Sequence, residues 1–112
     1  MTVDGQSVGR EHLLTGAFGA AIDRIEAHRI TLPPGQVVGR HSHTGGVVGV
    51  VLEGTVLFEI DGQEATTLHG GDVFYEPPGA TINHFDNASG TAPVVFLAFY
   101  PLRGDQPLLT ML

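Results

Sequence analysis

Short apolar runs separated by glycine and proline turns extend along most of the chain. Val47 to Leu52 is a continuous apolar run, which is typical of a strand buried on both faces. In Thr55 to Ile60 the larger apolar residues alternate with polar or smaller ones, and Asp61-Gly62 directly after it is a strong hairpin signal. The pattern predicts about eight to ten short strands. Those with clear bounds are Asp23 to Leu32, Gln36 to His43, Val47 to Leu52, Thr55 to Ile60, Gln63 to Leu68, Val73 to Glu76, Ala80 to Asp86 and Pro93 to Tyr100.

The spacing of the turns indicates the fold class. The 16 glycines and 7 prolines leave no room for a long helix between the predicted strands. Many short strands joined by tight turns predict an all-β fold, a jelly-roll barrel of two packed antiparallel sheets. A length of 112 residues fits one domain, so residues 1–112 are expected to form a single unit. Ala17 to Ala21 is expected to be either a short helical turn or an edge segment.

Composition excludes several classes of function. The formal charge is −7 and lysine is absent, so the chain lacks the basic surface that nucleic acids or anionic membranes require. Cysteine is also absent, which excludes disulfides, thiolate ligands and a cysteine nucleophile. No apolar run reaches the length of a membrane span, and the N-terminus has no secretory signal pattern. We therefore expect a cytoplasmic protein that binds neither nucleic acid nor membrane.

Two motifs in sequence order carry a family resemblance. In the first, Gly35 is followed, after five intervening residues, by His41-Ser42-His43, and the turn Glu53-Gly54 comes after the next strand. In the second, Gly71-Asp72 precedes a short strand and then Pro77-Pro78-Gly79, with Asn87 further along. Over roughly residues 27–100 the chain resembles the cupins. The resemblance implies a jelly-roll barrel that holds one metal ion.

His41 and His43 are the strongest candidate metal ligands. Alternate residues of a strand point to the same face, so both imidazoles are expected to face the inside of the barrel. Imidazoles spaced in this way can converge on one ion at about 2.0–2.1 Å. Histidine ligands suit several divalent transition metals, so zinc, iron, manganese, nickel and copper all remain open.

The sequence departs from the cupin pattern at two ligand positions. Where the family usually has a glutamate after the second histidine, this chain has Val47, and where the second motif usually has a histidine it has Ile82. The nearest histidine to Ile82 is His84, two residues further along the same predicted strand. Regular alternation would point both side chains inward. We therefore expect His84 to be the third metal ligand.

Two functions are consistent with these residues. The resemblance implies a metal-dependent enzyme that acts on a small organic molecule inside the barrel, as a dioxygenase, isomerase or lyase. The alternative is a non-catalytic binding or regulatory cupin with a degenerate metal site, because Val47 and Ile82 make the interior more apolar. No serine has the sequence context of a nucleophile, and no helix follows Gly45-Gly46 or Gly70-Gly71 to form a phosphate loop.

The C-terminal third of the chain indicates self-association. The run from Pro93 to Tyr100 is apolar on both predicted strand faces, and only one of these can face the core. Pro107 to Leu112 is a second apolar stretch. We expect a symmetric homodimer in which this tail packs on its own barrel or on the partner.

Overall fold

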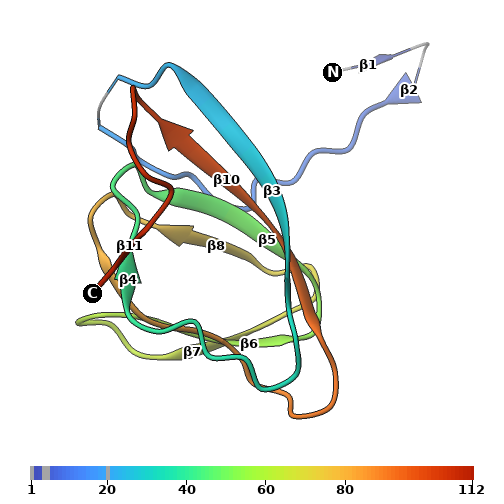
Figure 1. The fold of residues 1–112 in the computed structure, drawn as a ribbon. Coiled ribbons are helices and arrows are strands. Elements are labelled where there is room, and N and C mark those ends of the chain that lie inside the picture. Colours follow the sequence, from blue (N-terminus) through green and yellow to red (C-terminus); the bar gives the residue numbers. More distant parts are fainter. Residues whose placement is uncertain (1, 4–5, 20) are drawn as a thin grey trace.

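The protein folds into two antiparallel sheets that face each other across a common interior (Figure 1). The computed structural model describes residues 2–3, 6–19 and 21–112. Its strands are β1 (Thr2–Val3), β2 (Gln6–Ser7), β3 (Arg24–Leu32), β4 (His41–Ser42), β5 (Val47–Glu53), β6 (Thr55–Ile60), β7 (Thr66–His69), β8 (Val73–Glu76), β9 (Thr81–Asn87), β10 (Val94–Leu102) and β11 (Thr110–Met111). Within the described ranges, no helix is long and apolar enough to cross a membrane.

The strand order is that of a jelly roll. One sheet has the order β3-β10-β5-β8, the other has the order β11-β4-β9-β6-β7, and β1 and β2 pair with each other. Neighbours in the chain such as β5 and β6 lie in different sheets, so consecutive strands cross repeatedly from one side of the barrel to the other. The predicted all-β fold of two packed antiparallel sheets is confirmed.

The second predicted strand is the least accurate. A strand was expected over Gln36 to His43, but only β4 forms. The backbone before it makes hydrogen bonds that do not belong to a regular strand pairing. The amide of Val38 donates to the Asp86 side chain, and the amide of Asn87 donates to the carbonyl of Gln36. In the described part of the segment from Ala17 to Ala21 there is no helical turn.

The interior is filled by aromatic and branched side chains from both sheets. Phe85 of β9 packs on Phe96 of β10 and on Phe74 of β8, with ring centroids 4.7 and 4.9 Å apart. Phe74 reaches this position because Gly49 lies opposite it on β5, where an added Cβ would approach the Phe74 ring to 2.2 Å. The aromatic cluster fixes the two sheets face to face and leaves space beside it.

A β-bulge interrupts β9. His84 pairs with Glu59 and Ile82 pairs with Ile60, so Asn83 is an extra residue without a partner on β6. One additional residue reverses the alternation of side chains beyond it. As a result Ile82 and Phe85 are both buried in the core, whereas Asn83 and His84 are not.

The C-terminal tail packs on its own barrel. β11 pairs with β4, and the amide of Leu112 donates to the carbonyl of Arg40 at 3.1 Å. The tail therefore forms the edge of the five-stranded sheet beside the two histidines of the first motif (Figure 1). Of the two positions expected for the tail, on its own barrel or on a partner, the structure has the first.

Candidate metal centre

β4 and the turn after it place His41 and His43 inside the barrel. Their exposed fractions are 3% and 4%, and their ring centroids are 4.9 Å apart. The carbonyl of His43 accepts hydrogen bonds from the amides of Gly46 and Gly79, both at 3.0 Å. Both glycines have a positive φ, of 79° and 76°, which other residues rarely adopt. Two glycine turns thus fix the backbone at His43.

The Nδ1 atom of each histidine is hydrogen-bonded to a backbone carbonyl. Nδ1 of His41 donates to the carbonyl of Gly39 at 2.8 Å, and Nδ1 of His43 donates to the carbonyl of Leu108 at 2.6 Å. A carbonyl oxygen only accepts, so each Nδ1 carries the proton. In the neutral imidazoles the lone pairs are therefore on the Nε2 atoms, as metal-ligating histidines require.

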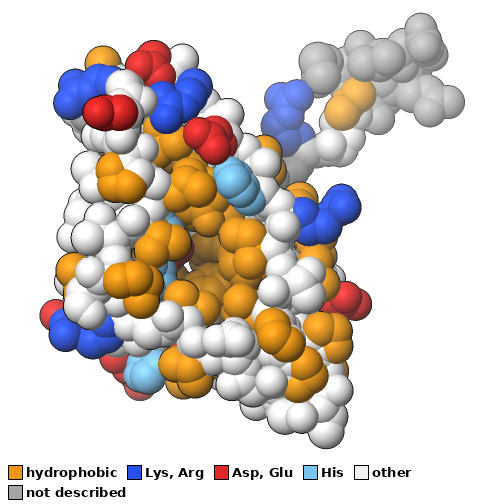
Figure 2. All heavy atoms as spheres, viewed as in Figure 1, with side chains coloured by type: hydrophobic (Ala, Val, Ile, Leu, Met, Phe, Trp, Pro, Cys, Tyr) orange, Lys and Arg blue, Asp and Glu red, His pale blue; other side chains and the backbone are white. Residues whose placement is uncertain are grey.

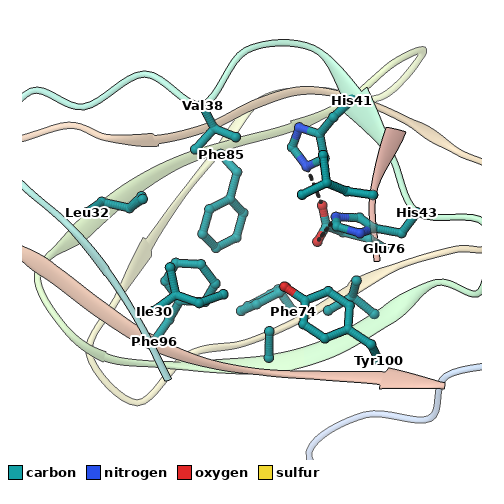
Figure 3. A pocket seen from close by; sticks show the side chains of 13 residues that line it. Ile30, Leu32, Val38, His41, His43, Phe74, Glu76, Phe85, Phe96 and Tyr100 are labelled. Atoms are coloured by element: carbon teal, nitrogen blue, oxygen red, sulfur yellow. Dashed lines mark ion pairs between the residues drawn. The ribbon is translucent and has the colours of Figure 1, made fainter. Parts of the chain in front are cut away.

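A buried glutamate completes the group. Glu76 lies at the end of β8, is 3% exposed, and directs its carboxylate between the two rings (Figure 3). Its Oε1 is 3.7 Å from Nε2 of His41, and its Oε2 is 3.8 Å from Nε2 of His43. Both distances exceed a hydrogen bond, and Oε1 has no hydrogen-bond partner among the described residues.

These three side chains fit a divalent metal ion. Their ligand atoms all lie within 4.8 Å of one another, so each can reach a common centre. Two imidazoles and one carboxylate are a ligand set that transition metals use in proteins. A buried carboxylate oxygen without a partner is costly, and an ion between the three groups would remove that cost.

Burial lowers the pKa of both histidines, and the Glu76 carboxylate raises it. For His41, burial lowers the pKa, but the adjacent Glu76 and the Gly39 carbonyl outweigh it, so the pKa is raised above 6.5. For His43, burial dominates over the attraction of Glu76, and the pKa is lowered. Burial and then the charge of Glu76 raise the pKa of Tyr100 to about 12, so its hydroxyl stays protonated at neutral pH.

The candidate ligands lie at one end of a cavity of about 170 Å³. The remaining walls are apolar and come from both sheets, as Figure 3 shows. Figure 2 shows a hollow on this face of the molecule ringed by hydrophobic side chains. The lining residues with apolar side chains are Ile30, Leu32, Val38, Val47, Phe74, Phe85, Phe96, Ala98 and Leu109.

His84, the third ligand expected from the sequence, lies apart from this group. Its side chain is 44% exposed, and its Nδ1 is 2.7 Å from Oδ2 of Asp86. The expected shared face of Ile82 and His84 does not occur, because the bulge at Asn83 reverses the alternation between them. The structure brings His41 and His43 together with Glu76 and does not bring His84 to them.

Sequence reasoning missed Glu76, although the sequence holds a signal for it. Glu76 pairs with Val47 across β8 and β5, so the carboxylate lies opposite the position where the family usually has its glutamate. In β8, Phe74 and Glu76 are two residues apart and therefore share a face. A phenylalanine in the core predicts an inward glutamate, and a buried acid needs a partner.

The comparison with family models decides the family. The model described as "Cupin domain" matches residues 28–100, which is most of the chain. This protein belongs to the cupin family. The match contains both histidines and Glu76, so the candidate metal centre lies within the cupin domain. Among curated proteins, no match was found.

Solved cupin-like structures share the fold at low sequence identity. An oxalate oxidase in complex with the substrate analogue glycolate has a TM-score of 0.66 and 20% identity over 79% of this chain and 46% of its own. A cupin-like protein from Thermotoga maritima MSB8 has a TM-score of 0.64 and 24% identity, covering 79% of this chain and 64% of its own. The DMSP lyase DddQ from Ruegeria pomeroyi DSS-3 has a TM-score of 0.65 and 22% identity, covering 78% and 42%. This chain therefore spans less than two thirds of each of these proteins.

Proposed function

We propose that this cupin binds one divalent transition metal per chain through His41, His43 and Glu76. The observation that carries the proposal is the buried Oε1 of Glu76, which has no hydrogen-bond partner in the part of the chain that the structure describes and is 3.7 Å from Nε2 of His41. The hydrogen bonds of both Nδ1 atoms orient the rings in advance. Such preorganisation lowers the cost of assembling the ligands around an ion.

We further propose that the protein is a metal-dependent enzyme acting on a small organic molecule held in the cavity. An ion with three protein ligands retains open coordination positions and can act as a Lewis acid on a bound molecule. The apolar walls would exclude water from the bound molecule, and the Tyr100 hydroxyl would provide a hydrogen-bond donor beside it. Oxalate oxidase and a DMSP lyase have a similar fold, and a dioxygenase, an isomerase and a lyase all remain open here.

The alternative is a non-catalytic cupin that binds a small molecule. The apolar character of most of the cavity lining favours it, because an apolar ligand could bind there by burial alone. In that case removal of the metal would leave ligand binding intact. Ligand binding by a metal-dependent enzyme would instead require the ion.

The metal content of the purified protein tests the proposal. We expect elemental analysis to find up to one divalent transition metal per chain after expression with ample zinc, iron, manganese, nickel and copper. The double variant His41→Ala, His43→Ala should contain none, and His84→Ala should match the wild type. Absence of metal from the wild type, or equal metal in the double variant, would disprove the site.

We also propose that two copies pair through the outer face of the four-stranded sheet. This face presents Val48, Val50 and Leu52 of β5 beside Leu97 and Phe99 of β10, all of them at least partly exposed. Phe99 and Leu52 are 37% and 45% exposed, which leaves a contiguous apolar surface to cover. Light scattering at micromolar concentration should give twice the 11.8 kDa of one chain. A monomer would contradict this assembly.

A further inference from the structure

The two ends of the cavity differ in chemistry. One end holds His41, His43 and Glu76 together with the hydroxyl of Tyr100, and the rest of the lining is hydrocarbon. Figure 3 shows Leu32 and Phe96 on one side and the candidate ligands with Tyr100 on the other. A molecule that fills this space must therefore be polar at one end and apolar over the rest of its surface.

Tyr100 supplies a hydrogen-bond donor to the cavity. It lies on β10, is 6% exposed, and its ring is held between His28 and His43 at centroid distances of 5.2 and 5.5 Å. Its hydroxyl points into the cavity (Figure 3). A molecule that displaces water from the cavity would remove the water partners of this hydroxyl, so an acceptor on that molecule would compensate for the loss.

The charge of the loaded site favours an anion. Two neutral imidazoles and one carboxylate would leave a divalent ion with one uncompensated positive charge in a buried, mostly apolar space. An uncompensated charge in such surroundings is costly, and a monoanion would balance it. A carboxylate brings one negative charge and two oxygens, one for the ion and one that can accept from the Tyr100 hydroxyl.

We propose that the cavity takes a small monocarboxylate with a compact apolar body, and that Tyr100 selects its carboxylate. This inference rests on the proposed metal site. The volume of about 170 Å³ limits the body of the molecule. A dry cavity of about 150 Å³ accommodates benzene, so the body has about six carbon atoms.

The experiment is a calorimetric titration of the zinc-loaded protein with acetate, butyrate, hexanoate and benzoate, and with hexanol and benzyl alcohol as neutral analogues. Each added methylene should tighten carboxylate binding about fourfold until the cavity is full, because each transfers apolar surface out of water. The alcohols should bind about tenfold or more weakly, since they lack the charge and the second oxygen. The metal-free protein should bind none of the carboxylates measurably.

Tyr100→Phe tests the selecting residue, and Tyr75→Phe is the matched control. The Tyr75 hydroxyl donates to the carbonyl of Ala17 outside the cavity. Tyr100→Phe should weaken hexanoate binding about tenfold and leave hexanol binding and zinc content unchanged, because a hydrogen bond to a charged group is lost. Tyr75→Phe should leave hexanoate binding unchanged.

The outcomes separate this inference from the metal site. Zinc bound at one ion per chain with hexanol and hexanoate binding equally would overturn the inference and leave the metal site standing. Unchanged hexanoate binding in a zinc-loaded Tyr100→Phe would overturn the role of Tyr100. A wild-type protein that holds no zinc would overturn both the inference and the metal site.

Discussion

Two regions in which the protein places histidine beside a carboxylate differ in both distance and burial. His84 and Asp86 are in direct contact at 2.7 Å, and the histidine is 44% exposed. His41, His43 and Glu76 are almost completely buried, yet their nearest atoms remain 3.7 and 3.8 Å apart. In the first region the polar groups satisfy each other and water reaches the rest of the ring. In the second they are removed from water and their nearest ligand atoms lie beyond hydrogen-bonding distance, which leaves room for a further partner between them.

Proximity alone is therefore a poor criterion for a metal site. By distance, His84 and Asp86 make the closer contact, and in this pair only the histidine is exposed. The buried group has weaker direct contacts but a common centre that all three side chains can reach. A buried polar atom that lacks a hydrogen-bond partner is therefore the more informative sign of a metal site.

The largest difference in zinc affinity should appear when the carboxylate of each region is removed in turn. Glu76→Val should weaken zinc binding by more than the roughly 10–100-fold that loss of an outer partner causes, because it removes a direct ligand. Asp86→Asn should leave zinc affinity nearly unchanged, since its oxygen can still accept from the Val38 amide. Titration against a chelator that competes for zinc measures both. Equal losses in the two variants would mean that the two regions are not different in function.

Moving the carboxylate across the strand pair should restore part of the affinity. Val47 lies directly opposite Glu76, and the Cβ atoms of opposed residues are about 4.5–5.5 Å apart. The double variant Val47→Glu, Glu76→Val should therefore regain about tenfold or more of the zinc affinity that Glu76→Val loses. The same chelator titration measures the regain. No regain would show that position 47 cannot direct a carboxylate to the ion.

Removal of the C-terminal tail should affect the buried histidines. A chain ending at Pro107 lacks the Leu108 carbonyl that orients His43, and zinc affinity should fall about tenfold, as for other outer partners. A chain ending at Thr110 keeps that carbonyl and is the matched control. Circular dichroism should show both shortened chains folded. Equal affinity of the two would mean that Leu108 does not orient the ligand.

Lowering the pH through the neutral range should weaken zinc binding, by less than the substitutions above. Because the pKa of His41 is raised above 6.5, a proton competes with the metal already near neutral pH. Affinity should be full above that pKa and should fall up to about tenfold per pH unit below it, and more steeply once His43 also protonates. Glu76→Gln should shift the onset to lower pH, because it removes the charge that raises the pKa. Chelator titrations between about pH 8 and about pH 5 would show it. An onset that does not move in this variant would contradict the role of Glu76.

The sequence was sufficient for the fold and for two of the three residues of the candidate site. Alternation and turn residues predicted most strands because each strand buries one face in a core, as Phe74, Phe85 and Phe96 do. His41 and His43 could be paired because they are close in sequence. Glu76 could not be connected to them without the register of β5 and β8, which depends on tertiary packing. The position of His84 depends on the bulge at Asn83, for which neither glycine nor proline gives a signal.

The most direct test is a crystal structure of the zinc-loaded protein with data collected at the zinc absorption edge. We expect one anomalous peak per chain inside the barrel. Nε2 of His41 and Nε2 of His43 should lie at about 2.0–2.1 Å from it, and a carboxylate oxygen of Glu76 at about 2.0–2.2 Å. A peak beside His84 and Asp86 instead, or a peak bound by the two histidines with Glu76 turned away, would contradict the account.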